Sequence, residues 1–194
     1  IDKLVLRWEA GIELPALEFK PVNGDGDLCL YVHGQGKHVE AAPGGPIERL
    51  VRAGNTVLAV DLRACGETRT TPWRYKNSLE FCGENVAEYF IAYMLDKSFT
   101  EMWAEDLLVA ARFLSARSAA GQNRRIRVIA VGDPGPAALH AVALEPDLFS
   151  SLTLRRSLLS WSDVVRTPIT KGALVTLVHG ALNVYDLPNL ISLI

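Results

Sequence analysis

The chain has 194 residues, of which 49% are hydrophobic and 22% charged, and its formal net charge is −2. This length fits one domain with a sizeable core, so we expect a single domain over residues 1–194. The near balance of charge leaves no basic stripe, which argues against binding to nucleic acid or to an anionic membrane. No apolar run approaches the roughly 20 residues that cross a bilayer, and we expect neither a transmembrane nor a signal segment in a soluble protein.

The cysteines and histidines indicate no metal site. The cysteines are odd in number and form no CxxC pair, which favours reduced thiols and a cytoplasmic location: Cys29, Cys65 and Cys82. Cys29 lies in an apolar run and is expected to be buried, whereas the other two occupy loop-like contexts where a thiol could be exposed. The four histidines lack the i,i+4 spacing of a zinc helix, so we predict no metal and no other cofactor.

The first third of the chain predicts an edge hairpin followed by a strand-helix-strand unit. Residues 3–9 and 13–19 alternate apolar and polar side chains, as in an antiparallel pair at a sheet edge. The nearly continuous apolar run 28–34 is typical of a strand buried on both faces. A helix over 46–53 begins with proline, and a second buried strand covers 56–61.

The remaining segments keep the rhythm of alternating helices and strands. We expect helices over 84–96 and 100–115, a buried strand over 126–131, a helix over 137–144 and a strand over 151–157. The tail 159–194 is predicted to be helical and irregular. This order predicts an α/β fold with a mostly parallel sheet and helices on both faces, incomplete at its C-terminal side.

The most informative stretch runs from Arg125 to Pro146. It predicts a buried strand, a tight turn of glycines and prolines, and then a helix, which is the arrangement that raises a catalytic nucleophile above a sheet. The expected serine is missing, because no serine in the chain has glycine two residues before and two residues after it.

Three motifs in order resemble the α/β-hydrolase fold. They are Tyr31-Val-His-Gly-Gln-Gly-Lys37, Val57-Leu-Ala-Val-Asp-Leu-Arg-Ala-Cys-Gly-Glu-Thr68 and Val131-Gly-Asp-Pro-Gly-Pro-Ala-Ala-Leu-His-Ala141. Within that superfamily the chain is most similar to the acetyl xylan esterase and prolyl-oligopeptidase-like branch of bacterial esterases, from about Leu14 onward. The resemblance implies relatives that hydrolyse carboxylic esters.

The resemblance assigns roles to the first two motifs. Gly34, Gln35 and Gly36 match the loop that supplies a backbone N–H to the oxyanion hole of the family. For His33 we favour a strand-end imidazole bonded to nearby backbone over direct contact with a substrate. Asp61 and Arg63 are interpreted as an ion pair or loop anchor rather than as catalytic groups.

The third motif departs from the family pattern at the nucleophile. Counting back from the predicted helix, Asp133 falls in the nucleophile column, and an Asp nucleophile does occur in haloalkane dehalogenases and epoxide hydrolases of this superfamily. Pro134 opposes that role, because proline lacks the N–H that completes the oxyanion hole. The alternative for Asp133 is an N-cap of the following helix or a turn residue.

The other catalytic partners are also difficult to find. In the family the acid and the histidine follow the nucleophile on later strands. His140 lies on the helix after the turn, which leaves His179 as the candidate base by sequence order. Asp163 and Asp186 are possible acids, although capping of helices suits them better. The sequence ends before the last strands of the family are reached, so we expect a truncated chain.

Two functions therefore stay open. One is an active hydrolase that uses Asp133 or is completed by missing or partner residues. The other is a catalytically impaired pseudoenzyme that keeps the fold and binds a small ester or carbohydrate. A sheet that stops at its fourth parallel strand exposes an edge, so we also predict a homodimer through that edge or through the apolar tail 187–194.

Overall fold

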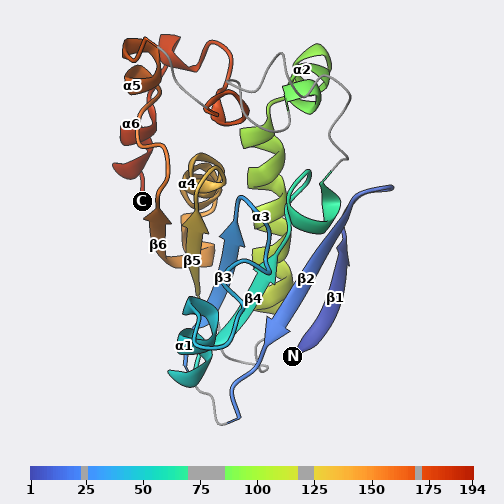
Figure 1. The fold of residues 1–194 in the computed structure, drawn as a ribbon. Coiled ribbons are helices and arrows are strands. Elements are labelled where there is room, and N and C mark those ends of the chain that lie inside the picture. The colour runs from blue at the N-terminus through green and yellow to red at the C-terminus, as the bar shows by residue number, and fades with distance from the viewer. Residues whose placement is uncertain (23–25, 70–85, 118–124, 169–171) are drawn as a thin grey trace.

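A computed structural model describes residues 1–22, 26–69, 86–117, 125–168 and 172–194 (Figure 1). The strands are β1 (Asp2–Arg7), β2 (Glu13–Phe19), β3 (Leu28–His33), β4 (Thr56–Val60), β5 (Ile126–Val131) and β6 (Phe149–Arg155). The α-helices are α1 (Pro46–Arg52), α2 (Val86–Met94), α3 (Phe99–Ala116), α4 (Gly135–Leu144), α5 (Trp161–Arg166) and α6 (Leu187–Ile191). Short 3-10 turns are η1 (Gly66–Thr68), η3 (Pro146–Leu148), η4 (Leu174–Thr176) and η5 (Ala181–Asn183).

The strands form one sheet in the order β1-β2-β4-β3-β5-β6. The strands β4, β3, β5 and β6 run parallel, while β2 is antiparallel to both β1 and β4. The predicted edge hairpin and the four parallel strands are therefore confirmed. The carboxyl ends of the parallel strands all meet at the upper edge of the sheet in Figure 1, which is where parallel α/β sheets place their ligand sites.

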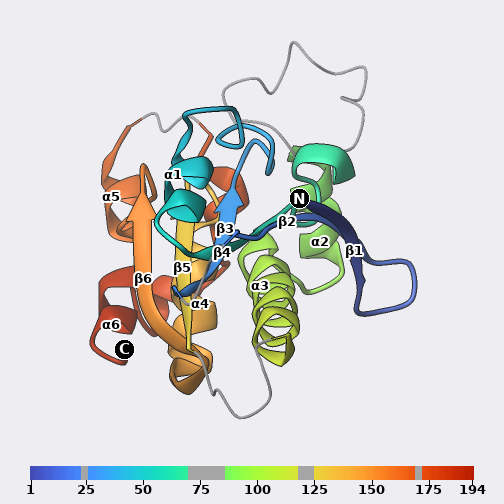
Figure 2. The ribbon, with the colours of Figure 1, turned by 90° about the horizontal axis from the view of Figure 1, so that it is seen from below.

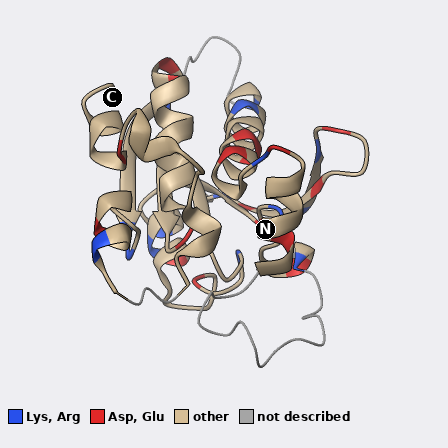
Figure 3. Cartoon of the chain, turned by 90° about the horizontal axis from the view of Figure 1, so that it is seen from above, with Lys and Arg blue, Asp and Glu red and all other residues tan. Residues whose placement is uncertain are grey.

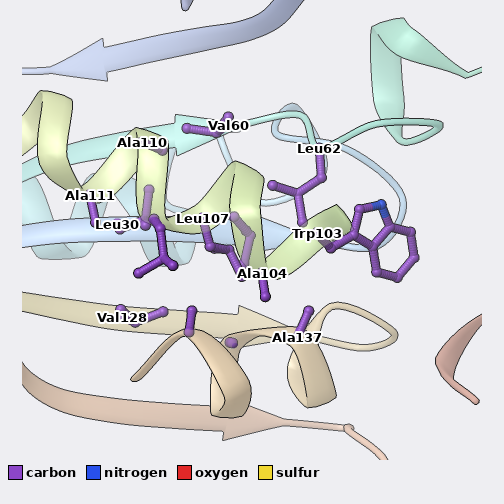
Figure 4. Close-up of a cluster of buried hydrophobic side chains, with 14 of the residues drawn as sticks. Leu30, Val60, Leu62, Trp103, Ala104, Leu107, Ala110, Ala111, Val128 and Ala137 are labelled. Carbon is purple, nitrogen blue, oxygen red and sulfur yellow. The ribbon is translucent and has the colours of Figure 1, made fainter. Parts of the chain in front are cut away.

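Helices cover both faces of the sheet, with α1 on one side and α3 and α4 on the other (Figure 2). Strand β3 shows why, because all of its residues are buried and they alternate between two cores. Leu30 and Val32 join the core beneath α3 and α4, whereas Cys29 and Tyr31 pack on the side of α1. Figure 4 shows the larger core, in which Leu30 lies among side chains from α3 such as Leu107. The predicted helices on both faces are confirmed.

Helix α3 is the longest helix in the described part of the chain, and it has a capping box that the sequence analysis did not identify. The Ser98 hydroxyl accepts a hydrogen bond from the Glu101 N–H, and the Glu101 carboxylate accepts one from the Ser98 N–H. The indole of Trp103 donates to the backbone carbonyl of Arg63 at 2.7 Å. The Trp103 bond ties the helix to the loop that follows β4.

The C-terminal segment packs against α4 rather than adding a strand. Leu139 of α4 contacts a cluster that includes Trp161, Ala181 and Leu187. Asp186 organises this segment, since its carboxylate accepts hydrogen bonds from the N–H groups of Trp161 and Leu187, both at 2.7 Å, and from the Ser160 hydroxyl at 2.6 Å. The capping role expected for Asp186 is confirmed.

Three local predictions are wrong. Helix α4 begins at Gly135 rather than residue 137, because Pro134 and Pro136 suit a helix start where no intrahelical donor is needed. Strand β6 covers Phe149–Arg155 rather than 151–157, because its pairing with β5 ends at Val131. Cys65 is buried against the main core, although its loop predicted exposure. Cys82 lies outside the described residues.

The last strand, β6, pairs only with β5 among the described strands. The homodimer through this edge or through the tail stays a prediction. Seen from above, acidic and basic residues are interspersed along the elements (Figure 3). None of the helices in the described part of the chain has the length and apolar character of a membrane span.

Candidate functional site

A cleft of about 240 Å³ lies at the carboxyl edge of the sheet, where β3, β5 and β6 end. The residues that line it come from three separate segments: His33, Gly34, Gln35, Val131, Gly132, Asp133 and Arg156. Three of them, Gly34, Gln35 and Asp133, are candidate site residues from the sequence, whereas the other two candidates, Gly36 and His179, are not among the lining residues. A second hollow, of about 300 Å³, lies beside α1 and the end of β2, and its charged residues Lys20 and Glu48 are already paired with other side chains.

The turn between β5 and α4 gives the cleft its floor. Gly132 follows the last residue of β5 and has a positive φ of 79°, a conformation that favours glycine. Its N–H donates to the Arg155 carbonyl at 2.9 Å, and its carbonyl accepts from the Gly135 N–H at 3.1 Å. A Cβ at Gly132 would meet no atom within 4 Å. The left-handed position of this turn is therefore occupied by Gly132, which has no side chain. Asp133 is the next residue along the chain and does not have a positive φ.

Asp133 lies in the cleft but does not cap α4. The N-cap residue is Pro134, and no side chain bonds to the helix start. The expected N-cap role is therefore wrong, because Pro134 and Pro136 supply no N–H to cap and the Gly135 N–H is used by Gly132. The other expected role, that of a turn residue, is confirmed, since Asp133 lies within the turn that the bond from Gly135 to Gly132 closes. The Asp133 side chain is exposed at the cleft, but nearby protein atoms desolvate its carboxylate and raise the pKa above the ordinary value.

The loop after β3 was predicted to supply oxyanion-binding amides. In the structure each of its three N–H groups already has an acceptor in the protein. Gly34 donates to the Val131 carbonyl at 3.0 Å, Gln35 to His33 Nδ1 at 3.0 Å and Gly36 to the His33 carbonyl at 2.8 Å. Gly34, Gln35 and Gly36 thus form a closed turn beside the cleft.

His33 is the most deeply buried polar group of the cleft. The residue is 7% exposed, and its Nδ1 accepts the bond from Gln35, which confirms the expected bond to nearby backbone. Its Nε2 has no hydrogen-bond partner among the described residues. Burial lowers the pKa of His33, and the charges of Arg156, Arg155 and His38 lower it further. The ring is therefore neutral near pH 7, with its proton on Nε2.

Arg156 was not predicted, and it lines the cleft from the residue after β6. Its φ is +51°, in the left-handed region that non-glycine residues seldom adopt, and its side chain is 71% exposed. Its nearest carboxylate is Glu40, at 3.7 Å. Both Glu40 oxygens are already bonded by Arg155, at 2.9 and 3.3 Å, and one of them also by the Tyr31 hydroxyl. The positive charge of Arg156 is only loosely offset.

A fully paired cluster adjoins the cleft. Lys37, which is 5% exposed, donates to the fully buried Asp61 from both its N–H and its ammonium group, each at 2.6 Å. Its ammonium also bonds to Glu67. Burial alone would lower the pKa of Lys37, but the bonds to Asp61 and Glu67 outweigh it and raise the pKa, so the lysine stays charged. We call these three residues the Lys37 clasp.

The clasp also explains a close backbone contact. Gly36 has a φ of 110°, and a Cβ there would lie 2.6 Å from the Cα of Gly66, so the two loops meet where only glycine fits. Nearby, Arg63 bonds to the buried Asp106 at 2.8 Å. The interpretation of Asp61 and Arg63 as ion-pair anchors is confirmed.

The two histidines that follow the turn lie outside the cleft lining. The Nδ1 of His140 bonds to the Pro136 carbonyl and its Nε2 to the Tyr185 hydroxyl, both at 2.7 Å. His179 is exposed and its ring packs edge-on against Tyr93 of α2, with centroids 5.3 Å apart. Asp163 lies in the first turn of α5, whose N-cap is Ser160. Neither His179 nor Asp163 is among the described residues that line the cleft.

The sheet order, the helices on both faces and the sharp turn after β5 define an α/β-hydrolase-like fold. No protein-family model and no curated protein matches the chain. Solved structures do match. Est1E from Butyrivibrio proteoclasticus, solved with ferulic acid, is 19% identical with a TM-score of 0.52, and the match covers 77% of this chain and 50% of that chain.

Two further structures agree with this fold. Dienelactone hydrolase from Anabaena variabilis has a TM-score of 0.51 and 16% identity, over 80% of this chain and 62% of that chain. The α/β hydrolase GrgF from Penicillium has a TM-score of 0.56 and 15% identity, over 81% of this chain and 46% of that chain. The chain thus spans between 46% and 62% of these three structures, and at such identities the likeness establishes the fold alone.

Proposed function

We propose that the chain is an α/β-hydrolase-like unit, related to carboxylic-ester hydrolases of the acetyl xylan esterase type, that does not cleave esters. The main observation behind the proposal is that Gly132 occupies the sharp turn after β5. Hydrolases of this fold place the nucleophile on the sharp, strained turn after the strand, and here the left-handed residue of that turn is a glycine. A glycine offers no atom that could attack a carbonyl carbon.

The loop after β3 supports the same proposal. Stabilising a tetrahedral intermediate needs N–H groups aimed at the developing oxyanion, and losing one such donor typically costs roughly 100- to 1000-fold in rate. The N–H groups of Gly34, Gln35 and Gly36 are all bonded within the protein. A substrate oxygen would have to displace one of these bonds to gain a donor.

The alternative function is an active hydrolase that uses Asp133. It is favoured by one observation, the exposure of the Asp133 carboxylate at the cleft. Against it, the histidine that lines the cleft among the described residues is His33, whose free nitrogen carries a proton and therefore cannot accept one as a general base.

Hydrolysis of p-nitrophenyl acetate separates the two functions. We expect no turnover above that of buffer with the wild-type chain or with Asp133→Ala. Turnover by the wild type that disappears in Asp133→Ala would overturn the proposal and establish Asp133 as the nucleophile. Turnover that survives in Asp133→Ala would also overturn it and would place the nucleophile elsewhere. Arg52→Gln, on the exposed surface of α1, is the matched control for a charge change away from the cleft.

A further inference from the structure

We infer that the outer edge of β6 pairs with the same edge of a second copy of this chain, in a two-fold symmetric dimer whose two β6 strands run antiparallel. Strand β6 ends the strand order and, among the described strands, pairs with β5 alone (Figure 1). The two six-stranded sheets would join into one. This inference goes beyond the proposed function and does not depend on whether the chain cleaves esters.

The backbone of β6 has bonding groups at its outer edge. The Arg155 carbonyl faces β5, since it accepts the Gly132 N–H at 2.9 Å. Backbone groups of successive residues in a strand point to alternate sides, so those of Leu152 and Leu154 point away from β5. Among the described residues, no hydrogen bond outside the pairing with β5 involves either leucine. Such an edge is a template for another strand.

The two edges of the sheet differ in charge. Strand β1, at the opposite end of the sheet, carries Asp2, Lys3 and Arg7. Strand β6 has neither a charged residue nor a proline from Phe149 to Leu154. Charged side chains and prolines are the usual means by which an edge strand avoids pairing with another chain. The β6 edge is therefore the one suited to an intermolecular pair.

The sequence of β6 complements itself when the strands are antiparallel and centred on Leu152. This register places Leu152 opposite the partner's Leu152, with backbone groups of both directed into the pair. It also places Ser151 opposite the partner's Thr153, at a position where facing side chains approach most closely. Apolar pairs and pairs of hydroxyl residues both stabilise antiparallel strands.

The charges that flank β6 favour the same orientation. Asp147 precedes the strand and is exposed, and among the described residues its carboxylate forms no ion pair. Arg156 follows the strand, is 71% exposed and has its nearest carboxylate at 3.7 Å. Antiparallel pairing centred on Leu152 places Arg156 opposite the partner's Leu148, one residue from the partner's Asp147. Parallel pairing in register would instead place each charge beside its own copy, which is unfavourable.

Exposed apolar side chains surround this edge. Helices α5 and α6 lie on the same side of the molecule as β6 (Figures 1 and 2). The segment after β6 has apolar side chains that are each more than half exposed: Leu159, Val165, Ile191, Leu193 and Ile194. A standard interface buries roughly 800 Å² on each partner, and these side chains would extend the contact beyond the paired strands.

The mass of the chain in solution tests the inference. Light scattering coupled to gel filtration, at loading concentrations from about 1 to about 100 µM, should give twice the mass of one chain at the upper end of this range. A mass of one chain throughout would overturn the inference and leave the edge to a strand of different sequence.

Matched variants at the two edges make the test specific to β6. Ser151→Lys adds an exposed charge to the inferred pair and should weaken dimerisation about tenfold or more. Val5→Lys adds the same charge to β1 and should dimerise like the wild type. Circular dichroism verifies that both variants are folded. A folded Ser151→Lys variant that dimerises like the wild type, or loss of the dimer in Val5→Lys alone, would overturn the inference.

Reversed charges test the orientation. Asp147→Arg and Arg156→Asp should each weaken dimerisation roughly two- to tenfold, because each places like charges together across the pair. The double variant Asp147→Arg/Arg156→Asp restores opposite charges and should recover most of the lost affinity, which a loss of folding could not produce. Additive weakening in the double variant would contradict the antiparallel orientation.

A cysteine pair tests the register. Facing residues of this kind have Cα atoms about 4.5 Å apart, within the range of a disulfide. Ser151→Cys/Thr153→Cys should therefore form a disulfide-linked dimer under mild oxidation, whereas the wild type and the two single variants should not. Absence of the linked dimer in the double variant, or equal linkage in the single variants, would contradict the register centred on Leu152.

Discussion

The Lys37 clasp and the cleft beside it are connected by a single turn, yet they differ in whether their polar groups have partners within the protein. In the clasp, the buried ammonium of Lys37 bonds to the Asp61 and Glu67 carboxylates, and the Asp61 carboxylate also accepts from two backbone N–H groups. In the cleft, His33 keeps an unused donor and Arg156 is only loosely paired. Buried polar groups that serve structure are normally satisfied within the protein. The difference separates a cluster whose polar groups are paired within the protein from a cleft whose polar groups keep unused bonding capacity.

Removing the lysine of the clasp should have the largest effect. Lys37→Met leaves the fully buried Asp61 without its cation, which we expect to cost roughly 3–5 kcal/mol of unfolding free energy. Urea unfolding followed by circular dichroism measures the loss. The control is Arg52→Met, whose exposed i,i+4 pair with Glu48 should contribute about 0.5 kcal/mol or less. Equal losses in the two variants would remove the distinction between the buried clasp and a surface ion pair.

The Asp186 carboxylate is a second polar group whose hydrogen bonds are satisfied within the protein, and it is distant from the cleft in sequence. Burial would raise its pKa, but the bonds from the Ser160 hydroxyl and the Trp161 N–H outweigh this and hold the pKa well below its ordinary value. Asp186→Ala removes acceptors at the starts of α5 and α6, and we expect a loss of about 2 kcal/mol, since one cap is typically worth about 1 kcal/mol.

Acid titration provides the check on Asp186. A carboxylate with a depressed folded pKa stabilises the protein above its unfolded pKa of 3.8, and this stability is lost as the pH falls below that value. Urea midpoints measured between pH 5 and pH 3 should therefore fall more steeply for the wild type than for Asp186→Ala. Parallel slopes would contradict the depressed pKa.

The buried His33 and the half-buried His140 predict a smaller pH dependence of stability in the neutral range. Burial lowers the pKa of both His33 and His140, so the unfolded chain takes up protons first as the pH falls below about 6.5. Stability should therefore be full above that pH and decline below it, by at most about 1.4 kcal/mol per pH unit for each histidine. His140→Gln should make the decline shallower, and an unchanged slope would show that His140 does not contribute.

Arg156 should give the smallest effect on stability. Arg156→Gly relieves left-handed strain of about 1 kcal/mol but adds conformational freedom to the unfolded chain, which costs about 0.5–1 kcal/mol. The unfolding free energy should therefore change by less than about 1 kcal/mol. A loss similar to that of Lys37→Met would mean that Arg156 belongs to the structural cluster rather than to the cleft.

Part of the cleft could be predicted from sequence. Gly34, Gln35 and Asp133 directly follow apolar strands, and parallel strands bring their carboxyl ends together. Arg156 carries the same signal, because it directly follows the fourth parallel strand, β6. His179 was selected by its order in the sequence alone, and it packs on α2 instead.

The sequence by itself determined the order of strands and helices, because the period of apolar residues and the turn residues act over short distances along the chain. Only the tertiary structure decided which polar groups have partners. His33, Asp133 and Arg156 lie at or just beyond the ends of three strands. Whether each finds an acceptor or a counter-ion depends in some cases on residues more than 100 positions apart, such as Glu40 and Arg155. No local sequence pattern encodes that pairing. The turn at Gly132 can therefore be identified from sequence, whereas the partners of the cleft's polar groups are known only from the tertiary structure.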